Sequence, residues 1–314
     1  MTTSNASRTA RIFFLLTLVT WAQIAFGALV RAKQAGLSCP DWPLCHGAVV
    51  PNLKLTGVVY EYGHRVFATV VSAVYLLGAV VGWRDPVLRQ RFRTMLIGMG
   101  VLLFVQAVFG GLTVLLVDKS DGIARPATWT VASHLILGNA FAALALVTAL
   151  QLREIALPEP PESLHLPRLV TPLAIVWSCA LLLQMVLGGS IAGSLQGLAC
   201  AEFPTCNGGI WFPTFDGYTG IQILHRGNAY LLVLVGWTLA YLLRNRGRLG
   251  LVSNGLGWLI LAQVSLGAMN VWSQLKPHIT TAHSLVAALL FSTTAVLALE
   301  LAKRRAAPSV ESGR

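Results

Sequence analysis

Residues 59–68 have the sequence VYEYGHRVFA and belong to a long apolar segment that nevertheless carries three ionisable side chains. These are Glu61, His64 and Arg65. Charged groups inside a bilayer are costly and are usually retained for a function. A second stretch, IQILHRGNAY at residues 221–230, repeats the His and the Arg but has Gln222 in place of Glu61. The two stretches predict a repeated membrane fold whose halves differ in one carboxylate.

The composition is that of an integral membrane protein. Of the 314 residues, 55% are hydrophobic and only 11% are charged, whereas a soluble domain has about 25% charged residues. A segment of about 20 apolar residues can cross a bilayer. Eight such segments occur, at residues 12–31, 58–83, 94–117, 129–152, 169–192, 219–243, 250–273 and 279–302. The first is long enough to span, so we expect no cleavable signal peptide and place the chain in a bacterial plasma membrane.

The net charge of +11 is explained by membrane topology and not by nucleic-acid binding. Of the 23 Lys and Arg residues, fifteen lie in the loops and tails on one side of the predicted spans and six on the other. Arg65 and Arg226 lie within spans. Cytoplasmic loops carry the excess of Lys and Arg. We therefore predict a multi-pass protein with both termini in the cytoplasm and no nucleic-acid partner.

The two halves of the chain are related in sequence. QIAFGALVRAKQAGLSCPDWPLCHG from Gln23 aligns without a gap with QMVLGGSIAGSLQGLACAEFPTCNG from Gln184, an offset of 161 residues. Each half has four spans, so both insert with the same orientation, and we predict an all-α fold of two parallel-repeat four-helix bundles. The predicted divisions are an N-terminal tail at 1–11, an N-terminal half at 12–152, a linker at 153–168, a C-terminal half at 169–302 and a tail at 303–314.

A shorter repeat occurs inside each half. Every odd-numbered span contains Gln-x-x-x-Gly followed by a small residue, at Gln23/Gly27, Gln106/Gly110, Gln184/Gly188 and Gln263/Gly267. Residues four apart share one face of a helix. Two interpretations stay open: the small residues let helices pack closely, or the glycines make room for a flat ligand.

Every even-numbered span carries one histidine near its start: His64, His134, His225 and His283. They occupy similar depths in the outer part of the bilayer. A packing role can explain one such histidine but not a set of four. Zinc usually takes Cys or carboxylate ligands as well, and a proton relay needs groups at changing depth. Two axial histidines on facing helices are typical of a haem site, so we predict two sites, from His64 with His134 and from His225 with His283.

Three polar residues beside these histidines extend the prediction. Arg65 and Arg226 could bind haem propionates, because Arg pairs with carboxylates in a bidentate manner; the alternative is that they extend to the outer headgroups. Glu61 lies one turn from His64 on the same helix face. It could exchange protons in a reaction, or it could simply pair with a neighbouring Arg. Because Gln222 cannot ionise, we expect chemistry in the N-terminal half and a fixed cofactor in the C-terminal half.

Two cysteine pairs, Cys39/Cys45 and Cys200/Cys206, lie in the predicted outer loops with the same Cys-x5-Cys spacing. That compartment favours disulfides. Each pair could be a structural cross-link or a redox-active dithiol. The spacing excludes a c-type haem attachment, which needs Cys-x-x-Cys-His.

The chain resembles the haem A synthase family, through EYGHR at 61–65, SHLILGN at 133–139, ILHRGNAY at 223–230, TAHSLVAA at 281–288 and the paired cysteine loops. The resemblance covers essentially the whole chain. It implies oxidation of the C8 methyl group of haem O to a formyl group by successive hydroxylations, as part of cytochrome oxidase assembly. It also implies haem b held by His225 and His283, substrate haem held by His64 and His134, and a catalytic Glu61.

The resemblance also suggests partners. These are haem O as substrate, the lipid bilayer, a haem O synthase (a prenyltransferase) that supplies the substrate, an electron acceptor that the sequence does not identify, and a second copy of the chain. Two other functions remain alternatives. One is a haem transporter or chaperone, and the other is a di-haem b-type electron-transfer protein.

Overall fold

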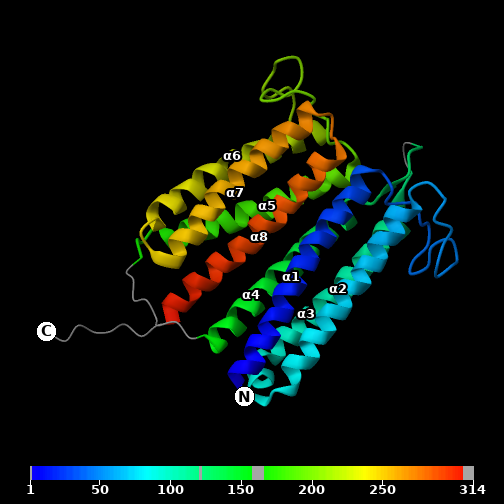
Figure 1. Cartoon of the computed structure of the whole chain (residues 1–314). Helices are drawn as coiled ribbons and strands as arrows, with labels where there is room; N and C mark the ends of the chain where they lie inside the picture. Colours follow the sequence, from blue (N-terminus) through cyan, green and yellow to red (C-terminus); the bar gives the residue numbers. More distant parts are fainter. Residues whose placement is uncertain (1, 120–121, 158–165, 307–314) are drawn as a thin grey trace.

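The structure, a computed structural model, describes residues 2–119, 122–157 and 166–306. Within these residues it has eight long helices and one short β-ribbon (Figure 1). The helices are α1 Thr2–Ala32, α2 Val58–Arg84, α3 Pro86–Leu115, α4 Thr128–Ala156, α5 Val170–Ser194, α6 Gly217–Leu243, α7 Gly247–Trp272 and α8 Pro277–Ala306. All eight are long and apolar enough to cross a membrane, which confirms the prediction of an all-α membrane protein.

The helix boundaries follow the predicted spans, with one large difference at the N-terminus. The predicted tail at residues 1–11 is helical from Thr2 onward, because apolarity marks the part of a helix within the bilayer and not its full length. Asn5 in this extension donates a hydrogen bond of 2.9 Å to Asp85, which also caps α3 by accepting from the backbone N–H groups of Val87 and Leu88. Parts of the predicted linker (158–165) and C-terminal tail (307–314) lie outside the described residues.

The β-ribbon was not predicted. Strands β1 (Val117–Asp118) and β2 (Arg125–Pro126) pair antiparallel in the connection between α3 and α4. The predicted span at residues 94–117 is therefore too long at its end, because Val117 belongs to this ribbon. Strands of two residues carry no periodicity that a sequence could show.

Each half has its own hydrophobic core. One cluster is formed by side chains of α1 to α4, among them Phe13, Tyr75 and Phe141. A second is formed by side chains of α5 to α8, among them Trp177 and Leu256. This agrees with two four-helix halves; that the halves are parallel repeats stays a prediction.

The halves meet along α4, the most buried of the eight helices. It packs against α5 and α8, and α1 packs beside α8 (Figure 1). Polar contacts join the halves at both ends of the bundles. At one end, Arg31 donates from Nε to the carbonyl oxygen of Ala192 at 2.8 Å. At the other, Glu154 forms ion pairs with Arg248 and Lys303.

The ends of the helices fall into two groups. The start of α1 and the end of α8 lie at one end of the molecule, and the loops that precede α2 and α6 lie at the other (Figure 1). The candidate site lies towards the end with these two loops.

Candidate functional site

Each of the four histidines contacts the glutamine of a Gln-x-x-x-Gly segment on the helix before it. Gln23 Nε2 lies 3.0 Å from His64 Nδ1 and donates to the backbone carbonyl of the same residue at 2.9 Å. His134 Nδ1 lies 3.1 Å from the backbone carbonyl of Gln106. In the second half, the Nε2 atoms of Gln184 and Gln263 lie 3.2 Å from His225 and His283, respectively. Sequence reasoning found both sets of residues but not that they form pairs.

The glycine of each segment makes room for the imidazole ring. A Cβ atom built on Gly27 would lie 2.8 Å from His64 Cε1. The corresponding distances are 3.0 Å at Gly110 and Gly188 and 3.4 Å at Gly267. Contacts below about 3.4 Å are tighter than almost all real Cβ contacts. Gly27, Gly110 and Gly188 therefore leave the space that the neighbouring imidazole ring occupies, whereas a Cβ atom at Gly267 would make an ordinary contact. Room for a separate flat ligand stays a prediction.

The histidines come together in the two predicted pairs. His64 and His134 lie close enough for their charges to interact, and so do His225 and His283. The Nδ1 atoms of His225 and His283 are buried and have no hydrogen-bond partner among the described residues. His134 Nδ1 faces a carbonyl, which can only accept, so this nitrogen carries the proton and leaves Nε2 free to coordinate a metal.

These observations fit a group that needs two imidazole ligands. Buried polar atoms normally have partners, so two unpaired ring nitrogens in one four-helix core favour a ligand there. Two imidazoles per half are a donor set that can hold the iron of a porphyrin.

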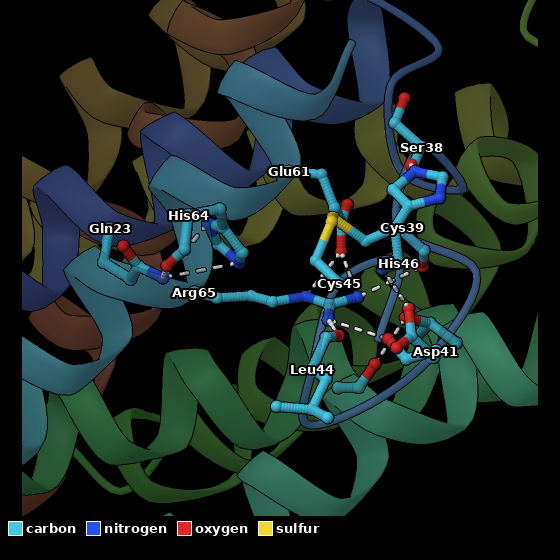
Figure 2. A network of polar contacts seen from close by, with 12 residues as sticks. Gln23, Ser38, Cys39, Asp41, Leu44, Cys45, His46, Glu61, His64 and Arg65 are labelled. Atoms are coloured by element: carbon cyan, nitrogen blue, oxygen red, sulfur yellow. Dashed lines mark hydrogen bonds and ion pairs between the residues drawn. A yellow bond between two sulfur atoms is a disulfide. The ribbon is translucent and has the colours of Figure 1, made fainter. Parts of the chain in front are cut away.

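Glu61 is buried and forms an ion pair with Arg65 on the same face of α2, at 3.1 Å (Figure 2). Both hydrogen bonds from Arg65 go to Oε1. Oε2 accepts no hydrogen bond within the described part of the chain. The expected alternative, an ion pair between Glu61 and a neighbouring Arg, therefore occurs, and it leaves one carboxylate oxygen available.

Gln222 occupies the matching position in the second half and contacts the loop before α6 instead of an arginine. Its Nε2 donates to the backbone carbonyl of Gly197 at 2.7 Å. Arg226 makes no ion pair with any described residue, and its guanidinium lies over the ring of Phe203, 5.6 Å from the centroid. The two halves therefore share the His-Arg arrangement and differ in the carboxylate.

Arg65 and Arg226 hold the two cysteine loops against the helices. Arg65 Nη1 donates to the carbonyls of Asp41 and Leu44, at 2.8 and 2.5 Å (Figure 2). Arg226 donates to the carbonyls of Cys200 and Thr205, at 2.9 and 2.7 Å. Sequence reasoning missed this role. A signal for it was that the arginine and both cysteines of the first half recur together in the second half at the same offset of 161 residues. The propionate contacts proposed for these two side chains stay a prediction.

Both cysteine pairs form disulfides, Cys39–Cys45 and Cys200–Cys206. Each loop is also organised by an acidic residue. Asp41 accepts from the backbone N–H groups of His46 and Gly47 (Figure 2). Glu202, 161 residues later, accepts from those of Gly208 and Gly209, at 3.1 and 2.9 Å.

The hydrogen bonds hold these two carboxylates in their ionised form. The backbone hydrogen bond from Gly47 is the largest cause that lowers the pKa of Asp41 below its ordinary value of 3.8. The one from Gly209 does the same for the pKa of Glu202, below 4.5. The two loops also share a contact between a side chain and a backbone carbonyl. His46 Nε2 lies 2.9 Å from the carbonyl oxygen of Ser38, and at the matching positions Asn207 donates to the carbonyl oxygen of Ala199 at 2.9 Å. His46 is therefore part of a loop and not of the candidate site.

Comparison with known proteins places this arrangement in a family. The model of the COX15-CtaA family, described as "Cytochrome oxidase assembly protein", matches residues 10–56 and 54–295. A protein named "Heme A synthase" from Halalkalibacterium halodurans is 27% identical, over 95% of this chain and 99% of its own length.

Two further relatives carry the same name. The one from Alkalihalophilus pseudofirmus is 25% identical, over 87% of this chain and 90% of its own. The one from Methylobacterium radiotolerans is 25% identical, over 90% of this chain and 87% of its own. The family match spans most of the chain and includes all four histidines, Glu61 and both disulfide loops. The chain belongs to the COX15-CtaA family of cytochrome oxidase assembly proteins.

Proposed function

We propose that this protein is a haem A synthase, which oxidises the C8 methyl group of haem O to the formyl group of haem A by successive hydroxylations. The relatives' names support haem A synthesis in general. One observation supports different roles for the two halves. They share the His, Gln, Gly and Arg framework, but three residues before the first histidine the N-terminal half has a buried carboxylate, Glu61, and the C-terminal half has Gln222.

In this proposal the C-terminal half holds the resident cofactor. His225 and His283 would bind the iron of haem b through ring nitrogens that have no other partner among the described residues. Gly188 and Gly267 keep the space beside these rings free of side chains. When bound, haem b would accept the electrons that the oxidation releases.

The N-terminal half receives the substrate. His64 and His134 would bind the iron of haem O, and Gln23 and Gln106 fix the orientation of these rings through the contacts described above. Hydrogen bonds to the other nitrogen orient a metal-bound imidazole and raise its basicity. The substrate is thus held with its methyl groups in the half that contains Glu61.

Glu61 would act as the proton acceptor. Converting a methyl to a formyl group takes up one oxygen atom, which water supplies, and releases four electrons to haem b and its acceptor together with four protons. The protons need a base within reach. Arg65 fixes the carboxylate through Oε1, and Oε2 is left free to take a proton. The carboxylate lies one turn of α2 from His64, so base and substrate ligand are carried by one rigid element.

We further propose that the basic end of the molecule faces the cytoplasm, with both termini there, and that the disulfide loops face the opposite side. Haem O would reach the N-terminal half from a haem O synthase, and a separate acceptor would reoxidise haem b. Association with a second copy of the chain is compatible with this scheme.

The test is to produce the protein in a bacterial host that makes haem O but no haem A, and to identify the haems bound to the purified protein. Wild-type protein should yield haem b together with haem O and haem A after extraction and chromatography. Glu61→Gln, which copies Gln222, should keep haem b and haem O but yield no haem A. Glu154→Gln removes a carboxylate from the opposite end of the same half and should leave haem A production intact.

The alternatives make different predictions in the same experiment. A haem transporter would yield no haem A whether or not Glu61 is present. A di-haem electron-transfer protein would yield two equivalents of haem b and neither haem O nor haem A. Full haem A production by Glu61→Gln would overturn the role proposed for this residue.

A further inference from the structure

A groove of about 950 Å³ opens between α2 and α3 at the end of the molecule where α1 begins. Its lining includes Trp83, Arg89, Arg93, Ile97 and Gly98. It lies at the far end of α2 from His64, about 28 Å along the helix at 1.5 Å per residue. The groove is therefore separate from the haem site and has no part in the proposed reaction.

Two uncompensated positive charges lie in this groove. Arg89 and Arg93 are four residues apart, on one face of α3, and both are exposed. Neither guanidinium forms a hydrogen bond or ion pair with a residue in the described ranges 2–119, 122–157 and 166–306. The acidic residue nearest in sequence, Asp85, is buried, and its carboxylate accepts hydrogen bonds from Asn5 and from the N-terminus of α3. The groove thus offers two guanidinium groups to an anion.

Beside the arginines the groove lining contains the polar Gln90 and Thr94, and beyond them an apolar surface that faces the lipid. Trp83 and Ile97 are 41% and 55% exposed, and further along the same two helices Val80 and Val101 are 47% and 58% exposed. A Cβ atom on Gly98 would meet nothing within 4 Å, so the groove is open at that point. A cationic end followed by an open apolar surface matches an amphiphile with an anionic head and hydrocarbon chains.

The second half has a groove in the matching place but without this chemistry. It measures about 560 Å³ and lies between α6 and α7. Gln106 and Gln263, which match in the repeat, are 157 residues apart. By the same offset Arg93 and Ile97 correspond to Gly250 and Asn254, which line the second groove. The arginine in this groove, Arg244, already has partners. Its guanidinium lies 4.0 Å from the centroid of the Tyr241 ring and donates a hydrogen bond to the backbone carbonyl of Tyr241.

We propose that the groove between α2 and α3 binds an anionic phospholipid. Arg89 and Arg93 bind the phosphate group, and the acyl chains lie over Trp83, Ile97 and Gly98. Arg is suited to this role because its planar fork can bind two phosphate oxygens at once. The groove lies at the end of the molecule that we predict to face the cytoplasm, where anionic lipids attract basic groups on membrane proteins. The proposal does not depend on the haem chemistry.

The experiment measures lipid binding to the full-length protein in bilayer discs of phosphatidylcholine that contain increasing amounts of phosphatidylglycerol. Bound lipids are counted by native mass spectrometry. Wild-type protein should retain phosphatidylglycerol in preference to phosphatidylcholine. Arg89→Gln/Arg93→Gln should weaken this binding about 30-fold, because each basic group near an anionic surface contributes about 1 kcal/mol.

The matched control is Arg84→Gln/Arg91→Gln, which removes one charge from the end of α2 and one from α3, at residues that do not line the groove. It should reduce binding much less. Equal losses in the two double variants, or no lipid preference in the wild type, would overturn the proposal. Millimolar inorganic phosphate should not displace the lipid; displacement would show that the groove binds free phosphate instead.

A second pair of variants keeps all the charges. Gly98→Leu fills the open part of the groove and should lower phosphatidylglycerol binding. Gly255→Leu makes the same change 157 residues later, where a Cβ atom also meets nothing within 4 Å, and should have no effect. This pair tests the groove even if the double arginine variant does not fold. Unchanged binding in Gly98→Leu would contradict the proposed path of the acyl chains.

Discussion

Arg65 Nη2 lies 3.1 Å from Glu61 Oε1, and the same guanidinium donates to backbone carbonyls of the loop closed by Cys39 and Cys45. One side chain therefore connects the candidate proton acceptor to a disulfide loop. In the second half, among the described residues, Arg226 donates to carbonyls of its loop and lies over the ring of Phe203 in that loop. A disturbance of the first loop should thus reach Glu61, whereas a disturbance of the second has no carboxylate to reach.

Replacing Arg65 should destabilise the protein more than replacing Arg226. Arg65→Gln leaves a buried carboxylate without its partner, which costs about 3–5 kcal/mol. Both Arg65→Gln and Arg226→Gln lose hydrogen bonds to loop carbonyls, each worth about 1.5–3 kcal/mol, so the unpaired carboxylate makes the difference between them. Unfolding followed by tryptophan fluorescence in detergent measures the difference. Adding Glu61→Gln to Arg65→Gln should restore part of the stability; a double-mutant cycle with no coupling would contradict this assignment.

The glycines beside the imidazoles should differ in their tolerance of a methyl group. A Cβ atom at Gly188 lies 3.0 Å from His225, and one at Gly267 lies 3.4 Å from His283. We expect Gly188→Ala to lower the haem b content or shift its reduced-minus-oxidised spectrum, and Gly267→Ala to change little. Haem per protein, from pyridine haemochrome spectra, is the measurement. Equal effects at both positions would show that ring clearance does not govern binding.

The two disulfide loops should lose stability in acid. Asp41 and Glu202 have a lower pKa in the folded loops than their ordinary values of 3.8 and 4.5. Their contribution is therefore complete above these ordinary values and is lost as the pH falls through the lower folded values. Hydrogen exchange at Gly47 and Gly208, corrected for intrinsic rates, should accelerate below about pH 4. In Asp41→Asn the exchange at Gly47 should lose this dependence while that at Gly208 keeps it.

Arg31 should stabilise the junction between the halves. Its guanidinium donates to the carbonyls of Ala192 and Gly193, at the C-terminal end of α5. A hydrogen bond that involves a charged group contributes about 1.5–3 kcal/mol, so Arg31→Met should lower the midpoint of thermal unfolding. Lys33→Met removes a nearby exposed charge and is the control. If the two variants melt alike, the contact with α5 contributes nothing measurable.

Much of the fold could be predicted from the sequence. The eight spans were located because hydrophobicity over about 20 residues is a local property that the bilayer imposes. The four histidines were identified as a set because the repeat placed them at equal depth. The ends of the helices were less predictable: α1 begins at Thr2 and not near residue 12, since a helix continues beyond the bilayer wherever its polar residues find partners such as Asp85.

The contacts of the candidate site could be predicted only in part. The repeat identified Gln23 and His64, but the order of residues along the chain does not show that the side chain of Gln23 contacts the ring of His64. Arg65 and Arg226 were expected to face a ligand or the headgroups. Which way a long side chain points depends on the loop folded above it, and here that loop presents its carbonyls.

By itself, the sequence determined the number of spans, the relation between the halves, the candidate histidines and the carboxylate that only one half has. These follow from composition, spacing and comparison of two segments of one chain. Only the tertiary structure decided that Gly27 and its counterparts accommodate imidazole rings, that the arginines hold the disulfide loops, and that Arg89 and Arg93 line an open groove. The physical reason is that these contacts depend on the rotation and spacing of neighbouring helices, which side-chain packing sets and hydropathy does not record.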